Sequence, residues 1–139
     1  MGQAYWPVYF ATLKARLARQ GRAVIQAITV PDGYFDTYRR GSDFIRHYTF
    51  PGGMLLSGEV IADQARRAGL AVRDSFAFGA DYARTCAAWH DRLDRQSDRI
   101  RRLGYDERFL RNWRFYLGIC TASFAVGQTD VVQVELAHA

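Results

Sequence analysis

The feature that most constrains this chain is the run Arg22–Val30, in which apolar and β-branched side chains are almost continuous. Pro31, Asp32 and Gly33 follow it directly and supply the chemistry of a turn. A run of this length and composition predicts a strand. Its nearly unbroken apolar character is typical of an interior strand that is covered on both faces. We therefore expect this segment to lie within a sheet that helices cover.

The spacing of apolar residues elsewhere predicts the other elements. Helices are expected over residues 5–20, 58–68, 81–99 and 107–126, a helical or irregular stretch over 34–48, and further strands over 70–78 and 131–136. Ser57 and Asp106 are expected to cap the helices that follow them, because their side-chain oxygens can accept hydrogen bonds from unpaired backbone N–H groups. The order of elements predicts an α/β fold, a mixed sheet with helices on both faces.

Three strands are few for such a sheet, since a typical sheet has about five or six. Three largely apolar strands would leave an unpaired apolar edge, and such an edge tends to pair with another chain. We therefore expect further strands to precede residue 1 in the complete domain. For the same reason, the chain is expected to self-associate or to pair with the missing half.

Composition limits the classes of function. The chain has 139 residues, of which 49% are hydrophobic, and it contains neither a signal-like N-terminus nor an apolar run of the ~20 residues that cross a membrane. These features predict a cytoplasmic protein. The net charge of +5 comes almost entirely from arginine, since Lys14 is the single lysine. Arginine binds phosphate well, which suits an anionic lipid surface or a nucleic acid. Because the arginines are spread over several predicted helices, no nucleic-acid partner is expected.

Motifs that carry chemistry are sparse. The sequence has no GxGxxG loop, no phosphate-binding P-loop and no HExxH motif. His47, His90 and His138 lack metal-ligand spacing, so no metal site is expected. Cys86 and Cys120 are the only cysteines, and they are interpreted as reduced, buried thiols.

Five segments, and Gln133 in the closing strand, nevertheless carry a recognisable series of motifs. The segments are GQAYWPVYF at 2–10, VIQAIT at 24–29, YTFPGGML at 48–55, FGADYART at 78–85, and the helix from Phe109 to Phe124. In this order, they resemble the C-terminal half of the cyclopropane fatty acid and mycolic acid cyclopropane synthases. The resemblance covers essentially the whole chain.

This resemblance implies a class I, Rossmann-like methyltransferase, with residues 1–139 forming the C-terminal part of a single domain. Enzymes of the family transfer a methyl or methylene group from S-adenosylmethionine to the cis double bond of a lipid acyl chain. The glycine-rich cofactor loop would lie in the missing first half, so the isolated chain is expected to be inactive and unable to bind S-adenosylmethionine. Either the reading frame is truncated at Met1, or a second polypeptide supplies that half.

The resemblance also implies site residues. The family holds a bicarbonate ion as general base, and Tyr82 matches the tyrosine that hydrogen-bonds it. Ile28 matches a residue that contributes through its backbone. Gln26 stands where the family has a histidine, so it either keeps the anion site or marks a branch with different chemistry. Four residues match positions that line the acyl-chain or cofactor pocket, although core packing explains them equally well: Phe50, Tyr116, Cys120 and Phe124.

The partners that follow are an unsaturated lipid acyl chain and, peripherally, an anionic membrane surface. The sequence leaves open whether the product is a cyclopropane, a methyl branch or a hydroxylated chain. A second class of function also stays open, namely a non-catalytic lipid-binding or assembly module derived from the same fold.

Overall fold

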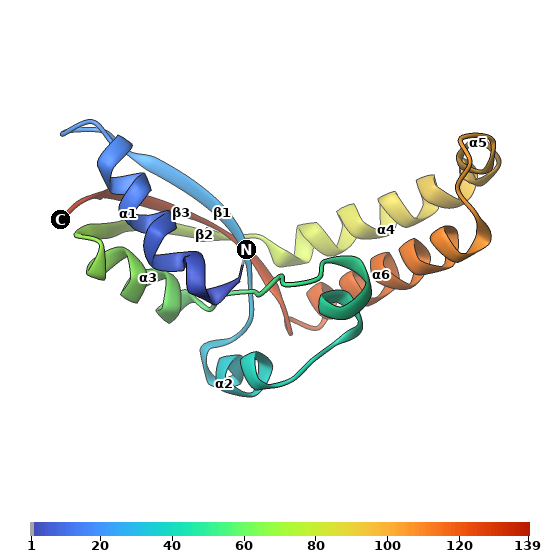
Figure 1. Cartoon of the computed structure of the whole chain (residues 1–139), viewed down its shortest axis with the longest axis horizontal. Helices are drawn as coiled ribbons and strands as arrows, with labels where there is room; N and C mark the ends of the chain where they lie inside the picture. Colours follow the sequence, from blue (N-terminus) through green and yellow to red (C-terminus); the bar gives the residue numbers. More distant parts are fainter. Residues whose placement is uncertain (1) are drawn as a thin grey trace. The chain divides into compact units, whose positions relative to one another are not determined.

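The computed structural model describes residues 2–139 (Figure 1). The chain divides into two compact units. The first contains the described residues up to Ala77 together with Asp130–Ala139, and the second is Phe78–Thr129. The two units are described separately below.

The first unit is built on a three-stranded sheet in the order β1-β3-β2. Its strands are β1 (Ala23–Thr29), β2 (Leu70–Ala77) and β3 (Asp130–His138). Both outer strands pair antiparallel with β3, whereas a bridge between Thr29 and Leu56 is parallel. The three described strands therefore form an antiparallel sheet, and the parallel contact is an isolated bridge outside it.

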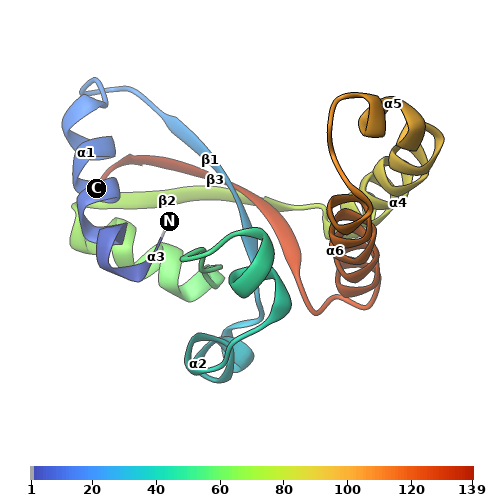
Figure 2. The ribbon, with the colours of Figure 1, turned by 45° about the vertical axis from the view of Figure 1, so that its right-hand side comes forward.

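The first unit also contains helical segments. They are a 3-10 turn η1 (Gln3–Tyr5), α1 (Trp6–Arg16), α2 (Asp32–Arg40), a π-helical turn η2 (Ile45–Thr49) and α3 (Gly58–Arg67). Figure 2 shows α1 and α3 against the same face of the sheet. The core between them contains Phe10 of α1, Ile61 and Ala65 of α3, and Val134 and Leu136 of β3, all nearly inaccessible to solvent. Burial of these side chains is the main favourable contribution to the fold of this unit.

The run Arg22–Val30 forms a strand as predicted. β1 lies at an edge of the sheet, and β3 is central. Side chains of β1 alternate in exposure, and Val24 is 64% exposed. The apolar composition indicated burial on both faces, but strand order depends on pairings with segments about 100 residues away.

Helix α1 ends at Arg16, four residues before the predicted end at residue 20. Leu17 is extended, with ψ of 125°, and its side chain packs against the core. Its carbonyl oxygen accepts a hydrogen bond from Nε2 of His138 at 3.1 Å. This contact with β3, which lies far away in the sequence, compensates for the helical hydrogen bond that the carbonyl loses.

The second unit is a helical hairpin. Its elements are α4 (Gly79–Arg95), α5 (Ser97–Arg102) and α6 (Glu107–Ala125). In both views of the ribbon, α4 and α6 run side by side in opposite directions, with α5 at the turn between them (Figures 1 and 2). The predicted single helix 81–99 is therefore interrupted after residue 95, where Gln96 leaves helical geometry.

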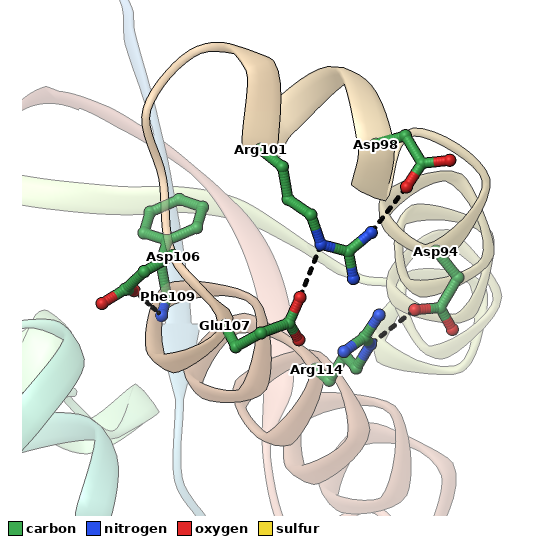
Figure 3. Close-up of polar contacts among 7 residues, drawn as sticks. All are labelled: Asp94, Asp98, Arg101, Asp106, Glu107, Phe109 and Arg114. Carbon is green, nitrogen blue, oxygen red and sulfur yellow. Dashed lines mark hydrogen bonds and ion pairs between the residues drawn. The ribbon is translucent and has the colours of Figure 1, made fainter.

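Ionic contacts join the three helices of this hairpin (Figure 3). Arg101 of α5 donates hydrogen bonds to Asp98 at 2.6 Å and to Glu107 of α6 at 2.5 Å. Arg114 of α6 donates to Asp94 of α4 at 2.6 Å. Such exposed pairs contribute little stability individually, but they specify how the helices are joined. The predicted caps are confirmed, since Asp106 accepts from the N–H of Phe109 at 2.8 Å and Ser57 from Val60 at 3.3 Å.

Candidate functional site

The second unit brings four of the predicted site residues together. Tyr82 and Cys86 lie one helical turn apart on α4, and Tyr116, Cys120 and Phe124 follow at four-residue intervals on α6. Residues at this spacing share one face of a helix. The two stripes face each other, since the rings of Tyr82 and Phe124 meet edge to face with centroids 5.2 Å apart. We call these five residues the aromatic–thiol cluster.

Every titratable group of the aromatic–thiol cluster is uncharged at neutral pH. Burial raises the pKa of the Cys86 thiol to about 11, and the neighbouring Cys120 thiol adds to the shift. Burial also raises the pKa values of Tyr82, Tyr116 and Cys120 above their ordinary range. The Tyr116 hydroxyl additionally donates a hydrogen bond to Cys120. Protonated thiols are poor nucleophiles, so this cluster is suited to contact with an apolar group rather than to covalent catalysis.

The hydroxyl of Tyr82 differs from that of Tyr116. Among residues 2–139, no hydrogen bond to the Tyr82 hydroxyl is formed, although its ring contacts three other aromatic rings. A half-buried hydroxyl without a protein partner is available to donate to water or to a ligand.

Gln26 and Ile28 lie in the first unit, on the same face of β1. Gln26 is paired with Gln133 across the β1–β3 ladder, and its Oε1 accepts a hydrogen bond from Gln133 Nε2 at 3.1 Å. This bond leaves the amide N–H groups of Gln26 as the donors for any ligand. Ile28 is half-buried and directly precedes the parallel bridge between Thr29 and Leu56.

Phe50 lies in the first unit. It is 49% exposed and begins a turn in which its carbonyl accepts from the N–H of Gly53 at 2.9 Å. Gly52 in this turn has φ of 77°, which favours glycine.

Two residues of these sites were not predicted as site residues. Cys86 belongs to the aromatic–thiol cluster, and its position four residues after Tyr82 was the available signal. Gln133 orients Gln26 through a hydrogen bond. In the sequence, the feature that could have indicated this role is that Gln133 is a single polar residue among the valines of β3.

The Gly52–Gly53 pair follows the π-helical turn η2 rather than a strand, so it does not join a strand to the N-terminus of a helix. Residues 2–139 also contain no group of three His, Cys, Asp or Glu side chains that could hold a metal ion. Within the same residues, no helix is both long and apolar enough to span a membrane.

Solved structures share this fold. The cyclopropane synthase MmaA2 from Mycobacterium tuberculosis matches 98% of this chain and 50% of its own, with a TM-score of 0.86 and 23% identity. The mycolic acid cyclopropane synthase CmaA1, complexed with SAH and CTAB, matches 98% of this chain and 50% of its own, with a TM-score of 0.87 and 24% identity. The fold is therefore that of the class I methyltransferases.

The sequence places the chain within that class. The family model "Mycolic acid cyclopropane synthetase" matches residues 1–134, and the chain belongs to this family. The tuberculostearic acid methyltransferase of Mycobacterium tuberculosis is 37% identical over 98% of this chain and 32% of its own length. The cyclopropane-fatty-acyl-phospholipid synthase of Escherichia coli K12 is 31% identical over 96% of this chain and 34% of its own. The chain spans about a third of the length of these curated relatives.

Proposed function

We propose that this chain is the C-terminal part of an enzyme that transfers a methyl or methylene group from S-adenosylmethionine to the double bond of an unsaturated fatty acyl lipid. The observation that carries this proposal is the aromatic–thiol cluster, an uncharged set of side chains in a member of the cyclopropane synthetase family. An acyl chain has no group that requires a charged partner, so neutral rings and protonated thiols are suitable contacts for it. The names of the relatives, a tuberculostearic acid methyltransferase and a cyclopropane-fatty-acyl-phospholipid synthase, support the same substrate class.

Within this proposal the site residues take separate roles. Tyr116, Cys120, Phe124 and Phe50 contact the acyl chain. Tyr82 and Gln26 each use a hydrogen-bond donor toward a bicarbonate ion that serves as general base, and Ile28 contributes through its backbone. The free Tyr82 hydroxyl and the amide N–H groups of Gln26 suit an oxyanion. Because Gln26 does not titrate, it would hold such an ion without exchanging a proton.

S-adenosylmethionine is bound, in this proposal, by a first half of the domain that these residues do not include. Residues 1–139 alone are therefore expected to be inactive. Pairing with that half, or with a second copy, would cover the outer edge of β1. The lipid is expected to reach the enzyme at an anionic membrane surface, where a net charge of +5 favours association.

A non-catalytic lipid-binding or assembly module is the alternative. The absence of a glycine-rich turn between a strand and a helix among residues 2–139 favours this second candidate. The coding sequence just upstream discriminates between the two. An in-frame glycine-rich motif followed by Glu-x-x-Gly would support the enzyme, whereas a true start at Met1 without a partner gene would support the module.

The proposal is tested with the full-length protein, labelled S-adenosylmethionine and phospholipid vesicles that contain unsaturated acyl chains. Label should enter the acyl chains. Phe124→Ala should raise the KM for lipid, because it removes a buried ring from the aromatic–thiol cluster. Phe115→Ala on the same helix, where the ring is 52% exposed, is the matched control and should leave KM unchanged. Absence of label from every unsaturated lipid would contradict the proposal.

A further inference from the structure

Three arginines converge at one end of the sheet in the first unit. Arg19, Arg22 and Arg73 line a cleft of about 320 Å³, and the remaining lining residues are Gln20, Gly21, Ala137 and His138. The three arginines come from the segment after α1, the residue before β1 and the middle of β2. The fold, rather than the sequence, therefore brings these three charges together.

The charge of this cleft is mostly uncompensated. Arg22 forms an ion pair with Glu135. Neither Arg19 nor Arg73 forms an ion pair with any carboxylate of residues 2–139. Asp74 directly follows Arg73 in β2, and one of its carboxylate oxygens already accepts from the N–H of Ser75 at 2.8 Å.

The walls of the cleft are held in place by hydrogen bonds. The ring of His138 donates to the carbonyl of Leu17, which attaches the segment after α1 to the end of β3. Arg73 donates to the carbonyl of His138 at 2.9 Å, so its guanidinium is oriented across the strand end. A Cβ at Gly21 would lie 3.0 Å from the carbonyl oxygen of Ala18, so this turn admits a side chain only if it shifts. An oriented set of donors loses less entropy on binding than a set of mobile side chains.

We propose that this Arg19–Arg22–Arg73 cleft binds a phosphate-class oxyanion, either a free phosphate ester or the phosphate of a lipid headgroup. Guanidinium groups match phosphate oxygens in geometry and remain charged at every physiological pH. None of its lining residues belongs to the aromatic–thiol cluster, and its test does not depend on methyl transfer.

The test uses the 139-residue chain with two probes, inorganic phosphate and vesicles of phosphatidylcholine with or without phosphatidylglycerol. Phosphate should shift the amide NMR signals of Gly21 and Ala137, which line the cleft. The double variant Arg19→Gln, Arg73→Gln should bind the ligand probe about 25-fold more weakly than the wild type, because each arginine contributes about five-fold to the affinity. Arg102→Gln combined with Arg108→Gln is the matched control, because it removes two exposed positive charges from the second unit.

Each outcome decides the proposal. Arginine-dependent binding of phosphate alone identifies a free phosphate ester as the ligand, and arginine-dependent binding of anionic vesicles identifies a headgroup. Equal loss in both double variants, or phosphate shifts that avoid the cleft, would overturn the proposal, because binding would then reflect net charge alone. If the double Arg19, Arg73 variant melts at a lower temperature than the wild type, the single Arg19→Gln variant replaces it in the binding assay. Arg19 makes no ion pair within residues 2–139, so this single change breaks none. The NMR shifts of the wild type still show whether phosphate binds in the cleft.

Discussion

Replacing Tyr82 in two ways separates its ring from its hydroxyl. The ring contacts the rings of Phe78, Trp89 and Phe124, with centroid distances of 6.3, 5.8 and 5.2 Å. The hydroxyl forms no hydrogen bond within residues 2–139. Tyr82→Phe therefore keeps every ring contact and removes only the hydroxyl, whereas Tyr82→Ala removes both.

The two changes should have very different effects on stability. Tyr82→Phe breaks no internal hydrogen bond, so the free energy of unfolding should change by less than about 0.5 kcal/mol. Tyr82→Ala removes a half-buried ring from three aromatic contacts and should cost about 2–3 kcal/mol, at the lower end of the range for large-to-small changes. At about 4 °C per kcal/mol for a chain of this size, the melting temperature should fall by about 8–12 °C.

Thermal unfolding followed by circular dichroism measures both variants, and label transfer in the full-length protein measures their activity. Tyr82→Phe should fold normally but lose about 100-fold or more in kcat, because one donor to a bound oxyanion is missing. A Tyr82→Phe variant as unstable as Tyr82→Ala would show that the hydroxyl is structural. A fully active Tyr82→Phe variant would remove Tyr82 from the proposed anion site.

Three further predictions concern the cofactor, the sheet edge and the thiols. Calorimetry should detect no S-adenosylmethionine binding to residues 1–139, and stoichiometric micromolar binding would refute the proposed division of the domain. Light scattering should show self-association of the chain that Val24→Lys weakens, because lysine opposes pairing at the β1 edge; a stable wild-type monomer at low concentration would count against this. Cys86 and Cys120 should react with a thiol reagent at pH 8 only after unfolding. Because the pKa of Cys86 is raised in the folded state, the protonated Cys86 thiol should contribute to stability below about pH 9. This contribution should be lost as the pH rises through about 11, and melting temperatures measured across that range would show the loss.

Local patterns predicted most of the elements because their physical causes lie within a few residues. Ser57 and Asp106 cap their helices since each side chain needs only the backbone N–H three residues later. The stripe of Tyr116, Cys120 and Phe124 faces inward because four-residue spacing places these side chains on one side of α6.

Other parts of the candidate sites depend on contacts that no local pattern contains. Gln26 looked like an isolated polar residue in an apolar strand, and its partner Gln133 lies 107 positions away. The family resemblance pointed to an anion contact for Gln26. Only the hydrogen bond from Gln133, its partner in the β1–β3 register, indicates that the amide N–H groups of Gln26 are the ones left to donate to a ligand.

The sequence by itself determined the family, the spans of the three strands and the apolar faces of the long helices, because motif order and side-chain periodicity are properties of the chain. Tertiary structure alone decided that α1 stops at Arg16, where Leu17 is bound by His138. It also decided that β3 lies between β1 and β2 and that Arg19, Arg22 and Arg73 share one cleft. These features arise from pairings between distant segments, whose free energies depend on the whole sheet rather than on any stretch of neighbouring residues.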